Sequence, residues 1–470
     1  MDPFPLFNFG PGGTPALELE FQGGTLLLRY PGPLPDLLEV PDCQWDDRVG
    51  CYRTPAYRYR DLLVAARRQQ IPCCDRARAY AKVEFTQRVS RDPFPHQEAA
   101  LRAWLERGRR GVVVLPTGAG KSYVAILAIR ETGRSALVVV PTLDLMSQWY
   151  ATLQAAFDRE IGLLGGGYYE VRDLTVTTYD SAYLHMERLG HRFGLVIFDE
   201  CHHLPGPAYA QAAQCCLAPY RLGLTATPER EDGQQVWLDD LIGPMVFRQD
   251  IPDLAGEYLA EYEVVSLHVE LTAEERAAYA RARQDYLQFL REQGIQMNGP
   301  QGWGRFIAAS CRSAEGRRAF QSYRLQKEIA LAAPAKLRLL EALLHRHVRD
   351  QVLIFTHDNE TVYTISRRFL IPAITHQTPV KERREILAAF NQGEYGALVT
   401  SRVLNEGVDI PAANVAIILS GTASVREHVQ RLGRILRRHE GKRALLYEIV
   451  TRGTAEENVS ERRRKHHAYR

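Results

Sequence analysis

The chain has 470 residues and a net charge of +3; 45% of its residues are hydrophobic and 24% are charged. This balance excludes a disordered chain and suits about three domains of ~150 residues each. No apolar run reaches the ~18 residues of a membrane helix, and the N-terminus lacks the pattern of a secretory signal, so we expect a cytoplasmic protein with no membrane partner. The eight cysteines form no CxxC pair, which predicts reduced thiols rather than a zinc site.

The first segment, residues 1–75, is rich in proline and glycine and contains short apolar runs. The run TLLLRY at 25–30 is typical of a strand, and DLLVAARRQQ at 61–70 has the spacing of a helix. These patterns predict a small N-terminal α+β domain.

Residues 85–250 alternate short apolar runs with helical patterns, and residues 335–470 repeat that alternation. Runs such as SALVVVP and VAIILSG suit parallel strands that are covered on both faces. We therefore predict an α/β fold with two parallel-sheet domains.

Between these domains, residues 255–330 are polar and helical in pattern, and we expect a helical insert. Two roles are open for its aromatic residues Trp303, Phe306 and Tyr323. They either stack on bases or pack in a small core of the insert itself, and packing is the more common role of such residues.

A phosphate-binding loop is predicted where the strand GVVVLP meets the helix YVAILAIRE. Glycines allow backbone amides to surround an anion, and the start of a helix adds partial positive charge. The loop departs from the strict GxxxxGKS pattern because Leu115 stands where glycine is usual. The residues expected to bind ATP here are Thr117, Gly118, Gly120, Lys121 and Ser122.

Two carboxylates follow the apolar run FGLVIF, and the ends of such strands bind ligands in parallel sheets. We expect Asp199, together with Ser122, to hold Mg²⁺, and Glu200 to orient and deprotonate a water. The alternative is an acidic pair that only solvates a turn. His202 and His203 follow, but no other ligand lies at metal-binding spacing, so a zinc site is excluded.

The run Asp199-Glu200-Cys201-His202 resembles motif II of superfamily 2 helicases, whose fold is a pair of RecA-like domains. The remaining motifs of that superfamily are matched in their usual order at residues 93–97, 138–149, 175–181, 222–228, 352–360, 399–411 and 430–438.

The resemblance implies roles for individual residues. Gln97 would read adenine, and Gly407 and Asp409 would couple the nucleotide to the bound strand. From the second RecA-like domain, Gln430, Arg434 and Arg437 would complete the hydrolytic site, although 430–438 also reads as an exposed basic helix. Strand contacts would come from Thr142, Thr225, Thr227, Thr356 and Thr400.

Within the superfamily, the chain is similar to the compact archaeal and bacterial XPB helicases. Arg230-Glu231-Asp232, just after motif III (residues 222–228), matches a triplet linked to unwinding. The insert stands where that family has its thumb, and residues 1–75 stand where it has a damage-recognition domain.

This resemblance implies an ATP- and Mg²⁺-dependent DNA helicase or translocase of 3′→5′ polarity, active in nucleotide excision repair or related DNA processing. Single-stranded, forked or damaged duplex DNA would be its partner. Two alternatives remain open: an RNA-dependent ATPase, and a motor subunit that acts with a nuclease or restriction partner. The motifs do not distinguish DNA from RNA, because contacts with the nucleic-acid phosphate backbone recognise neither the sugar nor the sequence.

Overall fold

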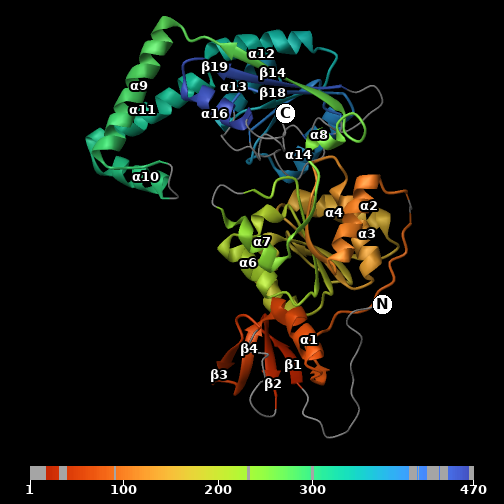
Figure 1. The fold of residues 1–470 in the computed structure, drawn as a ribbon. Coiled ribbons are helices and arrows are strands. Elements are labelled where there is room, and N and C mark those ends of the chain that lie inside the picture. Colours follow the sequence, from red (N-terminus) through yellow and green to blue (C-terminus); the bar gives the residue numbers. More distant parts are fainter. Residues whose placement is uncertain are drawn as a thin grey trace. The chain divides into compact units, whose positions relative to one another are not determined.

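The structure is a computed structural model, and it forms two compact units: residues 1–115 with 120–249, and residues 116–119 with 250–470. Each unit is described by itself, with the element labels of Figure 1. The residues that the structure describes are 17–30, 40–88, 91–229, 233–297, 301–401, 410, 412–420, 433 and 443–464.

A five-stranded sheet in the order β3-β4-β2-β1-β5 opens the first unit. Two glycines, Gly23 and Gly24, form the turn of the β1–β2 hairpin, and β5 pairs with β1 in parallel. Helix α1 covers the sheet through Tyr59 and Leu62, which are fully buried with Leu19 of β1. The elements are β1 (Leu17–Gln22), β2 (Thr25–Arg29), β3 (Gln44–Asp46), β4 (Cys51–Pro55), α1 (Tyr59–Arg68) and β5 (Cys73–Asp75).

The larger sheet of the first unit has eight strands in the order β13-β6-β12-β11-β7-β10-β8-β9, parallel except for β9. The inner strands β7, β10 and β11 are buried along their whole length, as the largely apolar sequences of β7 and β11 predict. The strands are β6 (Arg110–Val114), β7 (Ala136–Val140), β8 (Ile161–Gly165), β9 (Tyr168–Tyr169), β10 (Leu174–Thr178), β11 (Leu195–Asp199), β12 (Tyr220–Thr225) and β13 (Met245–Arg248). The helices are α2 (Pro95–Glu106), α3 (Lys121–Thr132), α4 (Leu143–Ala156), α5 (Tyr179–Leu189), α6 (Pro207–Gln214) and α7 (Trp237–Leu241).

The second unit contains a six-stranded, fully parallel sheet in the order β14-β19-β18-β15-β17-β16. Its strands are β14 (Glu261–Val269), β15 (Val352–Phe355), β16 (Ala373–Ile374), β17 (Ala397–Thr400), β18 (Val415–Ile418) and β19 (Arg443–Thr451). Its helices beside the sheet are α8 (Ile251–Leu254), α12 (Pro334–Arg346), α13 (Asn359–Phe369), α14 (Val380–Asn391) and α16 (Ala455–Arg464). The predicted parallel α/β organisation is thus confirmed in both units.

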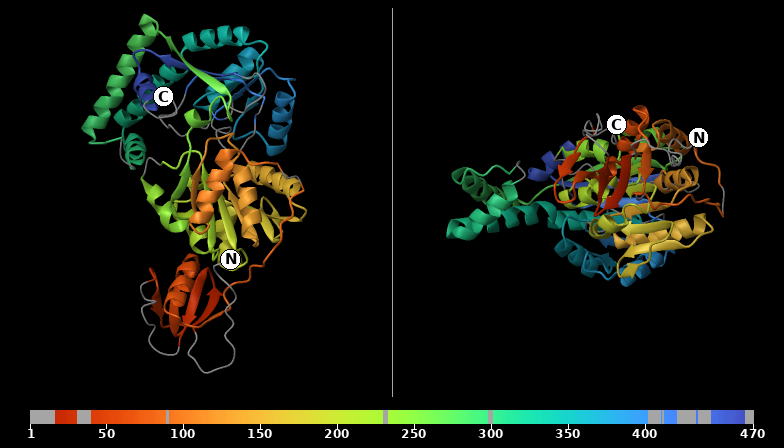
Figure 2. Two further views of the ribbon diagram at one scale, coloured as in Figure 1. Left: turned by 45° about the vertical axis from the view of Figure 1, so that its right-hand side comes forward. Right: turned by 90° about the horizontal axis from the view of Figure 1, so that it is seen from below.

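The insert differs from its expected form at its start, because β14 is a strand that pairs along its whole length with β19. The helical part begins at α9 (Ala273–Glu292) and continues with α10 (Gly302–Arg312) and α11 (Ala314–Leu331), which Figure 2 shows as an arm beside the second sheet. Tyr286, Phe289 and Phe306 form the core of this arm.

The insert's aromatic residues do not share one environment. Phe306 is fully buried and Tyr323 packs against the same core, as the packing interpretation predicts. Trp303 touches both rings but leaves 46% of its surface exposed.

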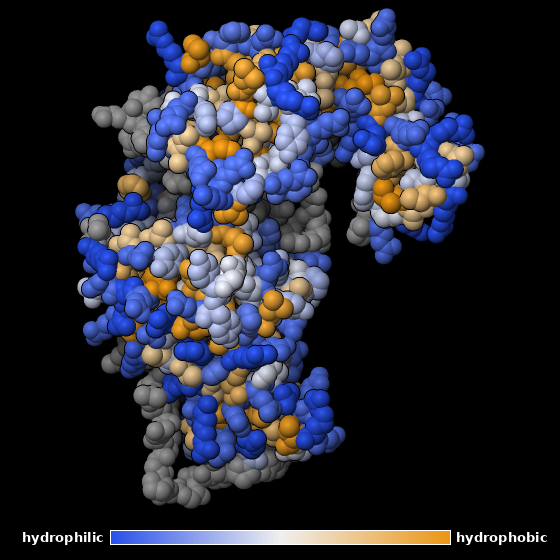
Figure 3. All heavy atoms as spheres, turned by 180° about the vertical axis from the view of Figure 1, so that it is seen from behind, coloured by the Kyte–Doolittle hydropathy of each residue, from blue (hydrophilic) through white to orange (hydrophobic). Residues whose placement is uncertain are grey.

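The surface agrees with the composition of the chain. Figure 3 shows mostly hydrophilic side chains on the visible face, with small apolar groups between them. Among the residues that the structure describes, no helix is both long and apolar enough to cross a membrane.

Candidate nucleotide site

The predicted phosphate loop connects the end of β6 to the first residue of α3. Gly118 and Gly120 adopt φ values of 91° and 83°, which side chains other than glycine rarely tolerate. A Cβ atom at 120 would lie 2.2 Å from Nε2 of Gln97, so a side chain there would displace the Gln97 amide. The amides of this loop and the start of α3 therefore suit an anion.

Lys121 and Ser122 stand at the start of α3. The Lys121 ammonium donates to the carbonyl of Leu115 at 3.2 Å, so it reaches back over the loop. Ser122 is exposed at the helix N-terminus. Both side chains are accessible to a ligand held by the loop.

Leu115, the departure from the usual motif, has a structural explanation. Its side chain is fully buried, and its amide donates to the carbonyl of Thr225 on the neighbouring strand β12 at 3.0 Å. Leucine here anchors the start of the loop to the sheet.

Gln97 lies beside the same loop, at the first turn of α2. Its Oε1 accepts from the Phe94 amide at 3.1 Å, and the residue is 1% exposed. The structure brings Gln97 to Gly120, although its contact with adenine stays a prediction.

The carboxylates Asp199 and Glu200 lie at the end of β11, in the same sheet. Oδ2 of Asp199 accepts from the indole N–H of Trp149 at 2.7 Å, and Oδ1 accepts from the Glu200 amide at 3.0 Å. Burial, followed by the charge of Glu200, raises the pKa of Asp199 to about 6, while Lys121 acts to lower it. Sequence analysis missed Trp149, because its spacing from Asp199 carries no signal.

Glu200 has a strained backbone and an unsatisfied carboxylate. Its φ of 48° lies in the left-handed region that residues other than glycine avoid. Its Oε2 is buried with no hydrogen-bond partner among the described residues. A buried acceptor of this kind suits a ligand or water that donates to it.

His202 connects this site to the end of β12. Its Nδ1 lies 3.0 Å from Oγ1 of Thr225 and 3.5 Å from Oε2 of Glu200. Thr225 also donates to the carbonyl of Thr227 at 3.1 Å. These contacts place the predicted motif III residues Thr225 and Thr227 against motif II. Both threonines are buried, so their side chains are not exposed to a nucleic-acid strand.

The other predicted strand contacts fall into two groups. Thr142 caps α4, where its hydroxyl accepts from the Leu145 amide at 3.2 Å. In the second unit, Thr356 and Thr400 are fully buried at the ends of β15 and β17, and Thr356 donates to the carbonyl of Asp358 at 2.9 Å. Their hydroxyls therefore face the protein interior.

Several predicted site residues lie outside the part of the chain that the structure describes, so their roles stay predictions. They are Arg230, Glu231, Asp232, Gly407, Asp409, Gln430, Arg434 and Arg437.

Oxygen donors at the site fit a magnesium ion. Asp199 provides a carboxylate and Ser122 a hydroxyl, which are ligand types that Mg²⁺ accepts together with water and phosphate. Within the described ranges, no group of three or more His, Cys, Asp or Glu side chains gathers to hold a metal.

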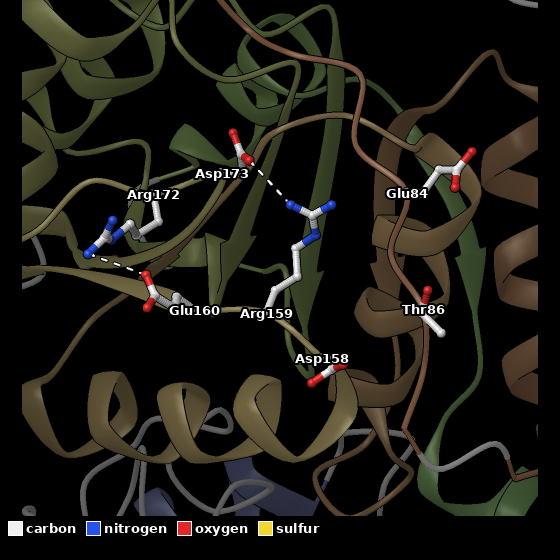
Figure 4. A pocket seen from close by; sticks show the side chains of 7 residues that line it. All are labelled: Glu84, Thr86, Asp158, Arg159, Glu160, Arg172 and Asp173. Atoms are coloured by element: carbon white, nitrogen blue, oxygen red, sulfur yellow. Dashed lines mark ion pairs between the residues drawn. The ribbon is translucent and has the colours of Figure 1, made fainter.

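A separate polar hollow of about 480 Å³ lies at the amino-terminal ends of β8 and β10, which is the opposite end of these strands from the nucleotide site (Figure 4). Its charges largely pair with one another: Arg159 lies 3.7 Å from Asp173, and Arg172 lies 3.4 Å from Glu160. These side chains are 41–79% exposed, which indicates a solvated surface rather than a reactive site.

The fold and this site define a P-loop ATPase of helicase superfamily 2. Three family descriptions match: "Xeroderma pigmentosum group B helicase damage recognition domain" at residues 19–77, "Type III restriction enzyme, res subunit" at 90–230, and "Helicase conserved C-terminal domain" at 335–439. The chain is 39% identical to the DNA 3′-5′ translocase XPB2 of Sulfurisphaera tokodaii, over 91% of this chain and 96% of that protein. The chain belongs to the XPB family of helicases.

More distant relatives are longer proteins. The DNA 3′-5′ helicase XPB of Mycobacterium tuberculosis is 31% identical, with 60% of its length covered. The Saccharomyces cerevisiae subunit XPB/SSL2 of the general transcription and DNA repair factor IIH is 27% identical, with 43% covered.

Solved structures agree on the fold. The helicase domain of Pyrococcus furiosus Hef aligns with a TM-score of 0.53 at 19% identity, over 78% of this chain and 97% of that chain. S. cerevisiae Dbp5 aligns with a TM-score of 0.55 at 14% identity, over 80% of this chain and 87% of that chain. At such identities the likeness shows the two RecA-like domains alone, and it confirms the predicted fold class.

Proposed function

We propose that this protein is an ATP-dependent DNA translocase or helicase that moves 3′→5′. The names of its relatives from S. tokodaii and M. tuberculosis support the substrate and the polarity. The observation that carries the proposal is the buried, unsatisfied Oε2 of Glu200, which lies beside Asp199 at the edge of the sheet that also bears the phosphate loop.

The residues of the first unit suit ATP hydrolysis. Lys121 and the loop amides would neutralise the phosphates, and Ser122 and Asp199 would hold magnesium, which supplies further charge neutralisation when bound. Glu200 would orient the attacking water and take its proton. In our proposal Gln430, Arg434 and Arg437 complete this site from the second RecA-like domain.

The proposed grip on DNA is directed at the backbone. In the second unit, Arg276, Arg283 and Arg291 recur along α9 and line one surface hollow, which suits phosphate contacts. We propose that Thr142, at the end of the eight-stranded sheet, adds a contact with the DNA backbone. We also propose that Arg230-Glu231-Asp232 acts in unwinding. Such contacts predict sequence-independent, salt-sensitive binding of single-stranded, forked or damaged duplex DNA.

A second candidate is the motor role within a larger machine. The match of residues 90–230 to a restriction-enzyme subunit supports it, because such a subunit is one part of an assembly. In this version of the proposal a nuclease partner cuts the DNA that the motor moves, in excision repair or related processing.

A polarity assay tests the proposal. Purified protein and ATP are added to partial duplexes with either a 3′ or a 5′ single-stranded tail, alongside Lys121→Ala. We expect displacement or streptavidin removal only with the 3′ tail and none with the variant. Equal activity on the two tails, or activity on matched RNA but not on DNA, would exclude the proposal.

A further inference from the structure

A short hairpin at the β9 edge of the eight-stranded sheet carries two adjacent tyrosines. Tyr168 and Tyr169 form β9, which pairs with the end of β8, and each is 59% exposed. Nothing in the proposed ATPase cycle uses these two exposed rings.

Three successive glycines hold this hairpin in place. Gly165, Gly166 and Gly167 have φ values of 126°, 61° and 93°, which together exclude other residues. A Cβ at 165 would lie 2.5 Å from Oγ of Ser181, and one at 166 would lie 2.8 Å from a methyl group of Leu143. The turn is therefore packed against the first turns of both α5 and α4.

The first turns of α4 and α5 lie at the carboxyl ends of the β-strands, where we predict contacts with a nucleic-acid strand. The ends of β7, β10 and β8 lie next to one another, because Val140 pairs with Thr178 and Leu164 pairs with Thr177. Thr142 and Thr178 cap the helices that start there. Strand β9 is thus the outermost member of one row, two strand spacings (~10 Å) beyond β10, whose last residue caps α5.

The surroundings of the rings favour bases over phosphates. Tyr169 rests edge-on against His185 of α5, with ring centroids 5.3 Å apart, so its ring is oriented by a neighbour. Leu184, on the same turn of α5, is 66% exposed. The next residue after the pair is the acid Glu170, which disfavours a phosphate at this point.

We propose that Tyr168 and Tyr169, which as successive residues of β9 point to opposite faces of the sheet, offer two stacking sites for unpaired bases of single-stranded DNA as the DNA strand leaves the row of helix caps. This inference rests on the proposed DNA motor function. Stacking on an aromatic ring is sequence-tolerant and adds affinity without neutralising a phosphate.

The test compares three variants of the full chain. Tyr168→Ala/Tyr169→Ala removes the rings, Tyr168→Phe/Tyr169→Phe keeps them without hydroxyls, and Tyr395→Ala removes a tyrosine that is 39% exposed in the second unit. Fluorescence anisotropy on labelled oligo(dT) measures affinity across salt concentrations. 2-Aminopurine within the oligonucleotide reports stacking through quenching of its fluorescence.

We expect the double alanine variant to bind about five- to 150-fold more weakly, with less quenching and an unchanged slope of log Kd against log salt. The phenylalanine and Tyr395→Ala variants should bind like the unmodified chain. Unchanged affinity in the double alanine variant, equal losses in both double variants, or a changed salt slope would overturn the inference while the motor function stands. Failure of the unmodified chain to bind any DNA would instead remove the proposed function.

Discussion

Two adjacent carboxylates, Asp199 and Glu200, are buried in the first unit, although removing a charged group from water is energetically unfavourable. Asp199 is 6% exposed and Glu200 is 7% exposed. The donors that offset this cost at Asp199 are the Trp149 indole and the Glu200 amide, whereas Oε2 of Glu200 accepts no hydrogen bond from the described residues and has only His202 Nδ1 at 3.5 Å. An unsatisfied carboxylate costs stability, and we interpret that cost as the consequence of keeping a base ready for water.

Glu200→Gln should separate binding from hydrolysis. Loss of the base is expected to slow ATP hydrolysis about 10²–10⁴-fold while binding of a fluorescent Mg·ADP analogue is retained. Removing one of two neighbouring charges should also raise the thermal midpoint. Lys121→Ala serves as the comparison and should lose nucleotide binding itself. Hydrolysis within threefold of normal in Glu200→Gln would contradict its role.

Trp149→Phe tests whether the indole positions Asp199. We expect the Mg²⁺ concentration that half-saturates nucleotide binding to rise about 10–100-fold, because the variant loses the donor to the carboxylate that we propose as a Mg²⁺ ligand. Trp104→Phe is a matched control: that indole is also buried, and it donates to the carbonyl of Arg221 at 2.9 Å, in a contact that includes no site residue. Equal Mg²⁺ dependence of the two variants would show that Trp149 only packs.

Residue types could be predicted at the site more readily than contacts. Lys121, Asp199 and Glu200 are recognisable because their chemistry is tied to a loop or a strand end. The bond from Trp149 to Asp199 depends on how α4 packs over the sheet, which no local pattern encodes. The reach of Lys121 back to Leu115 likewise depends on tertiary folding.

At the scale of elements, a buried ion pair holds the second sheet to its helices. Lys336 of α12 and Glu456 of α16 are 2.7 Å apart with side-chain exposures of 0% and 2%. The same ammonium donates to the carbonyls of Leu419 and Ile449, at 2.7 and 3.0 Å. One cation therefore connects two helices with the ends of β18 and β19.

Lys336→Met should destabilise the second unit by about 3–5 kcal/mol, because it leaves Glu456 buried without its counter-charge. Lys336→Met/Glu456→Leu should recover part of the loss, since no lone charge remains. Scanning calorimetry with limited proteolysis measures the change and identifies the unit that melts. A double variant no more stable than the single one would show that the uncompensated charge of Glu456 does not cause the loss.

Strand β14 could not be predicted from the sequence. Its residues EYEVVSLHV mix charged and apolar positions, and all but the last remain partly or fully exposed along an edge strand. Such a sequence lacks the unbroken apolar run by which the inner strands were recognised. The strand is fixed by pairing with β19, far along the chain, and that pairing is invisible in a local pattern.

For the whole molecule, sequence order and sheet order together explain the site. The phosphate loop, Asp199, Thr225 and Thr142 are separated along the chain, but their strands are parallel neighbours, so they reach one edge. Parallel strands joined by helices make that convergence predictable from the alternating pattern alone. How the two RecA-like domains act on each other depends on residues such as Arg434, whose role stays a prediction.

The steady-state ATPase rate of the full chain, measured without nucleic acid and with single-stranded DNA, forked DNA or matched RNA, tests the central claim most directly. A nucleic-acid motor should hydrolyse ATP several-fold faster with DNA, and Lys121→Ala should abolish the stimulated rate. A rate that DNA leaves unchanged, or that only RNA raises, would contradict the account.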